Sequence, residues 1–348
     1  KAVKKFARQK PFGFTGGLIV LFFCFCAVIP QALAPFDPRE LVGGRYDRPM
    51  TDAYDGFGGT YYLGTDDMGR DAFSRTVWGA RVSIRVGIVA VLVGISAGVV
   101  LGLTAGYLGG PFDMAVQRGV DAWMAFPGLL LLLTIMSITG RGVLQIILVL
   151  GITGGIPASR VVRGAVIGIK ENDYFQAAKA LGASKSRIFF RHVLPNIAAP
   201  LIVIFSINVG AVIIAEASLS FLGFGLPANI PSWGGMLSRE GRQYMEIAPR
   251  LALWPGLCLT VTVYSLNLFG DAMRDLLDPR LRGAQGSYGA AKKKRKRGLL
   301  SRLLNPFAYK KFPVFALRIP TGVIGIDSRT TVTVPTTAGL MLLWLNSA

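Results

Sequence analysis

Apolar runs long enough to cross a membrane recur along this chain, and they constrain its fold more than any other feature. A helix needs about 20 consecutive apolar residues to traverse roughly 30 Å of hydrocarbon. Runs of that length follow one another as far as Met273. Hydrophobic residues make up 52% of the sequence and charged residues only 16%, a balance that suits lipid better than water. The sequence therefore predicts an all-α integral membrane protein.

Six transmembrane helices are expected, most of them joined by short links. They cover Phe14 to Ala34, Val82 to Tyr107, Val120 to Thr139, Val143 to Ile167, Ile197 to Leu219 and Arg250 to Met273. The first could instead be the apolar region of a signal peptide that ends at Ala34, but it is longer than such regions usually are. We interpret it as a retained span, so that residues 1–34 form the N-terminus and the first transmembrane helix.

The second part of the chain, residues 35–81, is polar and mixed in charge. With the N-terminus inside, it predicts an outer loop that carries an interfacial helix near Asp66 to Trp78. Asp71 and Arg75 are four residues apart and can pair on that helix. Residues 82–283 then hold the remaining five spans as a helical core.

Positive charge gathers at the N-terminus, between the fourth and fifth spans, and in the tail, residues 284–348. The formal net charge is +19, and basic loops mark the cytoplasmic side of a membrane. We therefore expect both termini to be cytoplasmic and the charge to meet lipid headgroups rather than nucleic acid. The basic run Lys292 to Arg297 and the amphipathic stretch Leu299 to Leu304 predict a membrane-surface anchor in the tail.

Small residues recur every fourth position along the second span. They are Ala90, Gly94, Gly98, Gly102 and Gly106, and this spacing places them on one helix face. Such a face lets another helix backbone approach closely, and we expect it to pack mainly within this chain.

The loop between the fourth and fifth spans, residues 170–195, predicts a short helical hairpin. Asp173 can cap a first helix that contains Gln176 and ends at Gly182. Ser184 can begin a second helix, which Pro195 is expected to end.

This hairpin resembles the EAA loop of ABC importer permeases in the spacing of Gln176-Ala177-Ala178, Gly182, Ile188 and Leu194-Pro195. The resemblance implies a coupling helix that docks in a cleft of a partner ATPase. The docking residues would be Tyr174, Gln176, Ala177, Ala178, Lys179, Ala180, Leu181, Gly182, Ala183, Ser184, Ile188, Leu194 and Pro195. The leading Glu of the family is Gln176 here, which puts in doubt any charge contact at that position.

Other motifs narrow the resemblance to the dipeptide, oligopeptide and nickel permeases, with the Opp/Dpp C-type subunit as the best match. They are Leu63 to Asp71, Ser218 to Gly223, Pro231 to Gly234 and Asp278 to Arg282. The family implies the type I ABC importer permease fold in a bacterial cytoplasmic membrane, forming half of a pore for di- or oligopeptides. Candidate outer-face or binding-protein contacts are Asp66, Asp67, Arg70, Asp71 and Trp233.

The resemblance also implies partners. These are a homologous second permease subunit, one or two cytoplasmic ATPases that use ATP and Mg²⁺, and an extracytoplasmic solute-binding protein. The chain itself has no G-x-x-x-x-G-K-S/T phosphate loop, so we expect it to be a permease without enzymatic activity or a cofactor of its own.

Alternative functions remain open at this point. Transport of a nickel chelate or another small solute is the nearest one. An ion-coupled secondary transporter would need ionisable groups inside the membrane, and Asp121, Glu216 and Asp271 fall near predicted span ends instead. The single histidine, His192, argues against a membrane-embedded hydrolase and against a histidine metal site.

Overall fold

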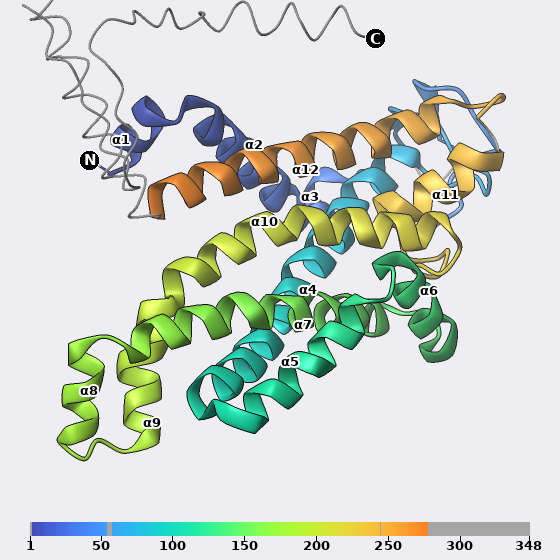
Figure 1. Cartoon of the computed structure of the whole chain (residues 1–348). Coiled ribbons are helices and arrows are strands. Elements are labelled where there is room, and N and C mark those ends of the chain that lie inside the picture. Colours follow the sequence, from blue (N-terminus) through green and yellow to red (C-terminus); the bar gives the residue numbers. More distant parts are fainter. Residues whose placement is uncertain (1, 54–57, 244, 278–348) are drawn as a thin grey trace, which may run out of the picture. The chain divides into compact units, whose positions relative to one another are not determined.

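Long helices dominate the residues that the computed structural model describes, which are 2–53, 58–243 and 245–277 (Figure 1). All of them belong to one compact unit, Lys1–Ser287. The predicted tail 284–348, with its basic run and anchor, lies outside the described residues. A two-stranded antiparallel ribbon, β1 (Thr51–Asp52) and β2 (Thr60–Tyr61), is embedded in the loop before the longest helix.

The helices follow one another with short connections over most of the described chain. They are α1 (Ala2–Gln9), α2 (Pro11–Val28), α3 (Pro30–Leu33), α4 (Ala72–Leu108), α5 (Gly110–Met124), α6 (Gly128–Thr139), α7 (Val143–Lys170), α8 (Asp173–Ala180), α9 (Lys185–Ile188), α10 (Leu194–Phe221), α11 (Trp233–Gln243) and α12 (Arg250–Leu277). One π turn, Phe189–Val193, joins α9 to α10.

Within the described residues, five helices are long and apolar enough to cross a membrane, or six if the bent pair α5 and α6 counts as one span. Large apolar side chains remain exposed along these helices, for example Leu21, Val100 and Ile138. Exposed leucine, valine and isoleucine on apolar helices are stable in lipid, where burial against protein is not required. The predicted fold class, an all-α integral membrane protein, is confirmed.

The centre of the bundle is the packing of α4 on α7, with α10 and α2 also resting on α4. The small residues of α4 make this contact possible. A Cβ atom at Gly94 would lie only 2.7 Å from the carbonyl oxygen of Gly151, and one at Gly98 would lie 2.9 Å from that of Gly155. The predicted small-residue face therefore packs within this chain, against α7.

Three predicted elements differ from the structure. The first span does not reach Ala34, because α2 ends at Val28 and Pro30 begins the separate short helix α3. The interfacial helix expected near Asp66 to Trp78 is not separate, because α4 begins at Ala72 and continues to Leu108 without a break. The third span is not a single helix from Val120 to Thr139 either. Instead, α5 and α6 meet at 90° around residues 125–127. Pro127 explains the break, since the residue before a proline is disfavoured in helical conformation.

Candidate functional site

The segment between α7 and α10 forms a helical hairpin, at the end of the bundle away from α11 (Figure 1). Its first helix, α8, stops at Gly182, which has a φ of +72°. The Ala183 N–H donates to the carbonyl oxygen of Ala178 at 3.1 Å, and the Gly182 N–H donates to that of Lys179 at 3.0 Å. These two bonds make a Schellman cap, which favours glycine at the left-handed position. The predicted helix stop is confirmed.

The start of α8 differs in detail from the predicted cap at Asp173. Asn172 is the N-cap residue and Asp173 the first helical residue. The Gln176 side chain turns back and donates from Nε2 to the carbonyl oxygen of Lys170 at 2.8 Å. Gln176 thus ties α8 to the end of α7 through its amide, a bond that a carboxylate could not donate.

The second half of the hairpin contradicts the expectation that Pro195 ends its helix. The chain passes from α9 through the π turn directly into α10, and the Leu194 N–H bonds to the carbonyl oxygen of Phe189, five residues back. Pro195 then lies in the first turn of α10, where its missing N–H is tolerated. Ser184 does begin the second helix as predicted, because its Oγ accepts from the Arg187 N–H at 3.3 Å.

The hairpin is anchored to α7 by a small apolar core. Phe175 and Ile188, one from each arm, are buried against Val162, Val166 and Ile169 of α7. Because both arms share this core, the hairpin and the end of α7 are packed as one body. A force on the hairpin is therefore transmitted to α7.

The predicted docking residues divide between this anchor and an outer face. Ala178 and Ile188 are buried, Ala183 and Leu194 are half-buried, and the exposed ones are Tyr174, Gln176, Ala177, Lys179, Ala180, Leu181, Gly182, Ser184 and Pro195. Leu181 is 88% exposed at the tip of the hairpin, although it is apolar. A surface of small residues around an exposed leucine suits contact with a protein groove.

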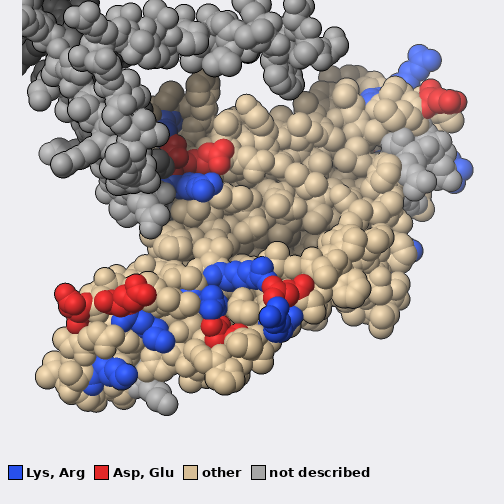
Figure 2. All heavy atoms as spheres, viewed as in Figure 1, with Lys and Arg blue, Asp and Glu red and all other residues tan. Residues whose placement is uncertain are grey.

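Charge is arranged unevenly on the hairpin (Figure 2). Glu171 and Asp173 are exposed at the start of α8, while Lys179, Arg187 and Arg191 are exposed further along. The ring of Tyr174 stacks on that of His192, with centroids 6.3 Å apart and planes inclined by 30°. The lone histidine of the chain is thus part of the hairpin packing.

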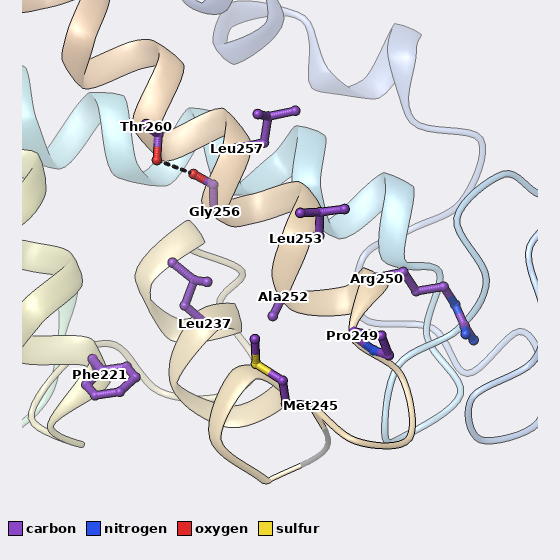
Figure 3. Close-up of a pocket in the computed structure, with 10 residues that line it drawn as sticks. All are labelled: Phe221, Leu237, Met245, Pro249, Arg250, Ala252, Leu253, Gly256, Leu257 and Thr260. Carbon is purple, nitrogen blue, oxygen red and sulfur yellow. Dashed lines mark hydrogen bonds between the residues drawn. The ribbon is translucent and has the colours of Figure 1, made fainter.

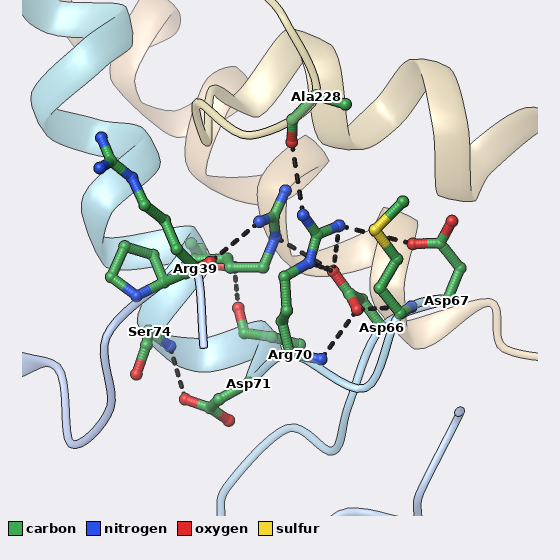
Figure 4. A network of polar contacts seen from close by, with 12 residues as sticks. Arg39, Asp66, Asp67, Arg70, Asp71, Ser74 and Ala228 are labelled. Atoms are coloured by element: carbon green, nitrogen blue, oxygen red, sulfur yellow. Dashed lines mark hydrogen bonds and ion pairs between the residues drawn. The ribbon is translucent and has the colours of Figure 1, made fainter. Parts of the chain in front are cut away.

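A buried polar network lies at the opposite end, before α4 (Figure 4). The Asp66 carboxylate accepts from Arg70 Nε at 2.7 Å and lies 3.2 Å from Arg75 Nε. Arg70 reaches Asp67 at 3.6 Å and the carbonyl oxygen of Ala228 at 3.4 Å. Asp66 is fully buried, so the network fixes the residues just before α4 to the segment after α10 rather than presenting charge outward.

Asp71 does not form the predicted pair with Arg75. Its Oδ2 accepts from the Ser74 N–H at 2.8 Å and caps α4, while Arg75 turns to Asp66 and to the carbonyl oxygen of Pro38. Burial raises the pKa of the Asp71 carboxyl above its ordinary value, although hydrogen bonds from Ser74 and Phe73 lower it in part.

Trp233 and Glu216 are also buried, and both face the start of α4. The Trp233 indole Nε1 donates to the carbonyl oxygen of Thr76 at 3.0 Å, and its backbone N–H donates to Ser83 Oγ at 3.3 Å. Glu216 accepts from Ser220 Oγ at 2.9 Å. Of the predicted outer-face residues, Asp66, Asp67, Arg70, Asp71 and Trp233 therefore all point inward, and any partner contact there would be made by their neighbours.

Two ion pairs between α5 and α7 were not anticipated from the sequence. Arg163 binds Asp113 with two parallel hydrogen bonds, and Arg160 pairs with Asp121, which also lies 3.9 Å from Arg118. The available signal was the presence of two arginines three residues apart inside an apolar run, because arginine is costly in lipid without a partner.

Two of the hollows among the described residues lie along the spans. One of about 810 Å³ lies between α11, the start of α12 and Phe221 (Figure 3). Its lining is almost entirely apolar. The Arg250 guanidinium at its edge already donates hydrogen bonds to the carbonyl oxygens of Tyr46 and Asp47. This hollow offers little to a polar solute. A second hollow, of about 360 Å³, lies where α5 and α6 meet α7 and α10.

Apolar spans, one of them broken, together with an anchored hairpin that exposes small residues, define a helical membrane transport protein. Residues 98–283 match the family described as the inner membrane component of binding-protein-dependent transport systems. The chain belongs to this family, the permease subunits of ABC importers.

Two relatives in sequence agree with this membership. The chain is 40% identical over 280 residues to a glutathione transport system permease protein, GsiD, of Pectobacterium atrosepticum, with 80% of this chain and 90% of the relative covered. It is 41% identical over 222 residues to a dipeptide transport system permease protein, DppC, of Alkalihalophilus pseudofirmus, covering 64% and 73%. The MetNI methionine ABC transporter, in an inward-facing conformation, is similar with a TM-score of 0.49 at 18% identity, covering 59% of this chain and 96% of that one.

Proposed function

We propose that this permease forms half of a translocation pore for di- or oligopeptides and that the hairpin, residues 170–195, docks on a cytoplasmic ATPase. The observation that carries the proposal is the combination of an exposed Leu181 tip with a core that locks the hairpin to α7. Only a rigidly attached hairpin can transmit the closing motion of an ATPase pair to the transmembrane helices.

The membrane orientation follows from the same assignment. Basic residues on the hairpin and at the N-terminus favour the cytoplasmic side for that end of the bundle. The loop 34–71 and α11 then face outward, toward an extracytoplasmic solute-binding protein. The buried network around Asp66 would hold this outer surface in shape rather than contact the partner directly.

Peptide is the substrate class because the relatives are named for glutathione and dipeptide transport. A homologous second permease would complete the pore, and ATP with Mg²⁺ would bind in one or two partner ATPases. ATP binding would close the ATPase pair, move the hairpins inward and open the pore outward. Hydrolysis would then restore the inward-facing state.

Reconstitution of the whole importer in proteoliposomes tests the proposal. We expect uptake of labelled peptide that needs ATP and loaded binding protein and that resists a protonophore. Uptake of a nickel chelate instead of peptide would refute the substrate class, and uptake driven by a proton gradient without ATP would refute the mechanism.

Leu181→Glu tests the docking residue itself. Its side chain is exposed, so folding should be unaffected, while a buried carboxylate in the ATPase groove should separate ATP hydrolysis from uptake. Leu181→Met keeps an apolar side chain and serves as the control. Equal uptake by both variants would show that the hairpin tip does not dock.

A further inference from the structure

The hollow at the broken span has the size and lining of a small-molecule site. Its volume is about 360 Å³, within the range usual for ligand pockets. Aromatic and aliphatic side chains such as Trp123, Phe126 and Leu132 form most of the wall. Thr153 and Asn208 are the polar side chains in it. Such a lining accepts an apolar side chain and offers few polar contacts.

A charged pair lies one helical turn from this hollow. Asp121 precedes Met124 by three residues on α5, and Arg160 follows Pro157 by three residues on α7, while Met124 and Pro157 themselves line the hollow. The side chains of Asp121 and Arg160 are 50% and 39% exposed, and Arg118 lies 3.9 Å from the same carboxylate. Partly exposed charges in a membrane-spanning segment are costly and usually mark a solute pathway.

The neighbouring ion pair between α5 and α7, Asp113 with Arg163, is less exposed. Asp113 is only 15% exposed and is held by Arg163 through two hydrogen bonds. This bidentate geometry fixes α5 to α7 and leaves little of the carboxylate free. Asp121 and Arg160 are therefore the pair that a solute can reach.

We propose that Asp121, Arg160 and the adjoining hollow hold a zwitterionic di- or tripeptide during its passage, and this rests on the proposed peptide transport. The peptide ammonium pairs with Asp121, its carboxylate pairs with Arg160, and one side chain enters the hollow. Binding breaks the one pair between these two residues and forms two pairs with the peptide termini, and the water that both termini lose offsets the second pair. Binding is therefore weak, which transport requires for release.

Reversing the pair separates this role from a structural one. In the reconstituted importer, we expect the double variant Asp121→Arg with Arg160→Asp to restore the ion pair, and hence assembly and ATP hydrolysis. Its peptide uptake should still be about tenfold slower than that of the wild type. In the orientation in which the peptide enters the pore, its ammonium would then face an arginine and its carboxylate an aspartate. The matched swap of Asp113→Arg with Arg163→Asp should recover uptake. Equal recovery in both swaps would overturn the proposal.

A second variant tests the hollow without changing charge. Gly154 lines it, and a Cβ atom there would meet nothing within 4 Å, so Gly154→Leu has room for its side chain. We expect it to slow uptake of a phenylalanine-containing dipeptide about fivefold relative to glycylglycine. Gly164→Leu, at an equally open position of α7, should keep the wild-type ratio.

An unchanged ratio in Gly154→Leu would overturn the assignment of the hollow. Because every comparison uses a wild-type importer that transports peptide, these failures are distinct from a failure of the proposed function. That failure would show as no ATP-dependent peptide uptake by the wild type.

Discussion

The indole nitrogen of Trp233 donates a hydrogen bond to the carbonyl oxygen of Thr76 at 3.0 Å across 157 residues of sequence. The ring is fully buried and meets Phe23 edge to face, with centroids 5.7 Å apart. One side chain thus joins α11 to the beginning of α4 and to α2. The packing explains why this tryptophan, which looks like a surface contact in the sequence, lies inside.

Replacing Trp233 should therefore weaken the outer end of the bundle. Trp233→Phe loses the hydrogen bond and leaves a small void, at a cost of about 1–3 kcal/mol. The midpoint of thermal unfolding in detergent should fall accordingly. Trp254→Phe, at a residue that is 38% exposed on α12, is the control and should change little. Equal midpoints for the two variants would contradict the assigned role.

Asp66 should be more sensitive to substitution than an ordinary loop aspartate. Asp66→Asn removes the negative charge that Arg70 and Arg75 share, and it leaves two buried guanidinium groups without that compensation. Breaking a buried charge network in this way costs about 3–5 kcal/mol. The measurement is again the unfolding midpoint. Asp52→Asn, at an exposed residue of the same loop, should stay within about 0.5 kcal/mol of the wild type.

Asp71 should make stability fall as pH rises. Burial raises the pKa of its carboxyl in the folded state, so the folded protein holds this proton to a higher pH than the unfolded chain does. Stability is lost as the pH rises from the ordinary aspartate pKa, about 3.9, to the raised pKa of the folded state. At higher pH this contribution is constant. Asp71→Asn keeps an oxygen to cap Ser74 and carries no charge.

The difference in unfolding midpoint, Asp71→Asn minus wild type, should therefore increase as the pH rises through this window. At pH 7 the variant should be at least as stable as the wild type. Asp71→Ala removes the cap and should be less stable than Asp71→Asn by about 1 kcal/mol. A wild type more stable than Asp71→Asn at pH 7 would show that the buried charge is favourable.

Apolar runs, residue periodicity and helix-ending residues in the sequence predict much of this fold. Apolar run length placed the spans, the four-residue repeat of small residues placed the face of α4 that meets α7, and Gly182 placed the end of α8. Each of these depends on local backbone geometry or on one helix face. The hairpin was predictable for the same reason.

The errors arose where distant segments decide the outcome. Arg75 lies four residues from Asp71, yet Asp66 and the Pro38 carbonyl oxygen provide its contacts because the loop folds back over it. Pro195 was expected to end a helix, but the π turn before it shifts the hydrogen bonds and lets the helix continue. The partners of Arg160 and Arg163 lie on another helix, which no local pattern identifies.

The contact between α4 and α7 gives the sharpest steric prediction. A methyl group at Gly94 would lie 2.7 Å from the carbonyl oxygen of Gly151 and 3.3 Å from the backbone nitrogen of Gly155, so even Gly94→Ala must push the two helices apart. Overpacking of this kind costs about 1–3 kcal/mol and should lower the unfolding midpoint. Gly168→Ala, at an open position of α7, provides the control, because its methyl group would meet nothing within 4 Å and alanine favours the helix. Since α7 carries the hairpin, Gly94→Ala should also lower uptake per ATP hydrolysed, and wild-type coupling together with a wild-type midpoint would show that the helices separate freely.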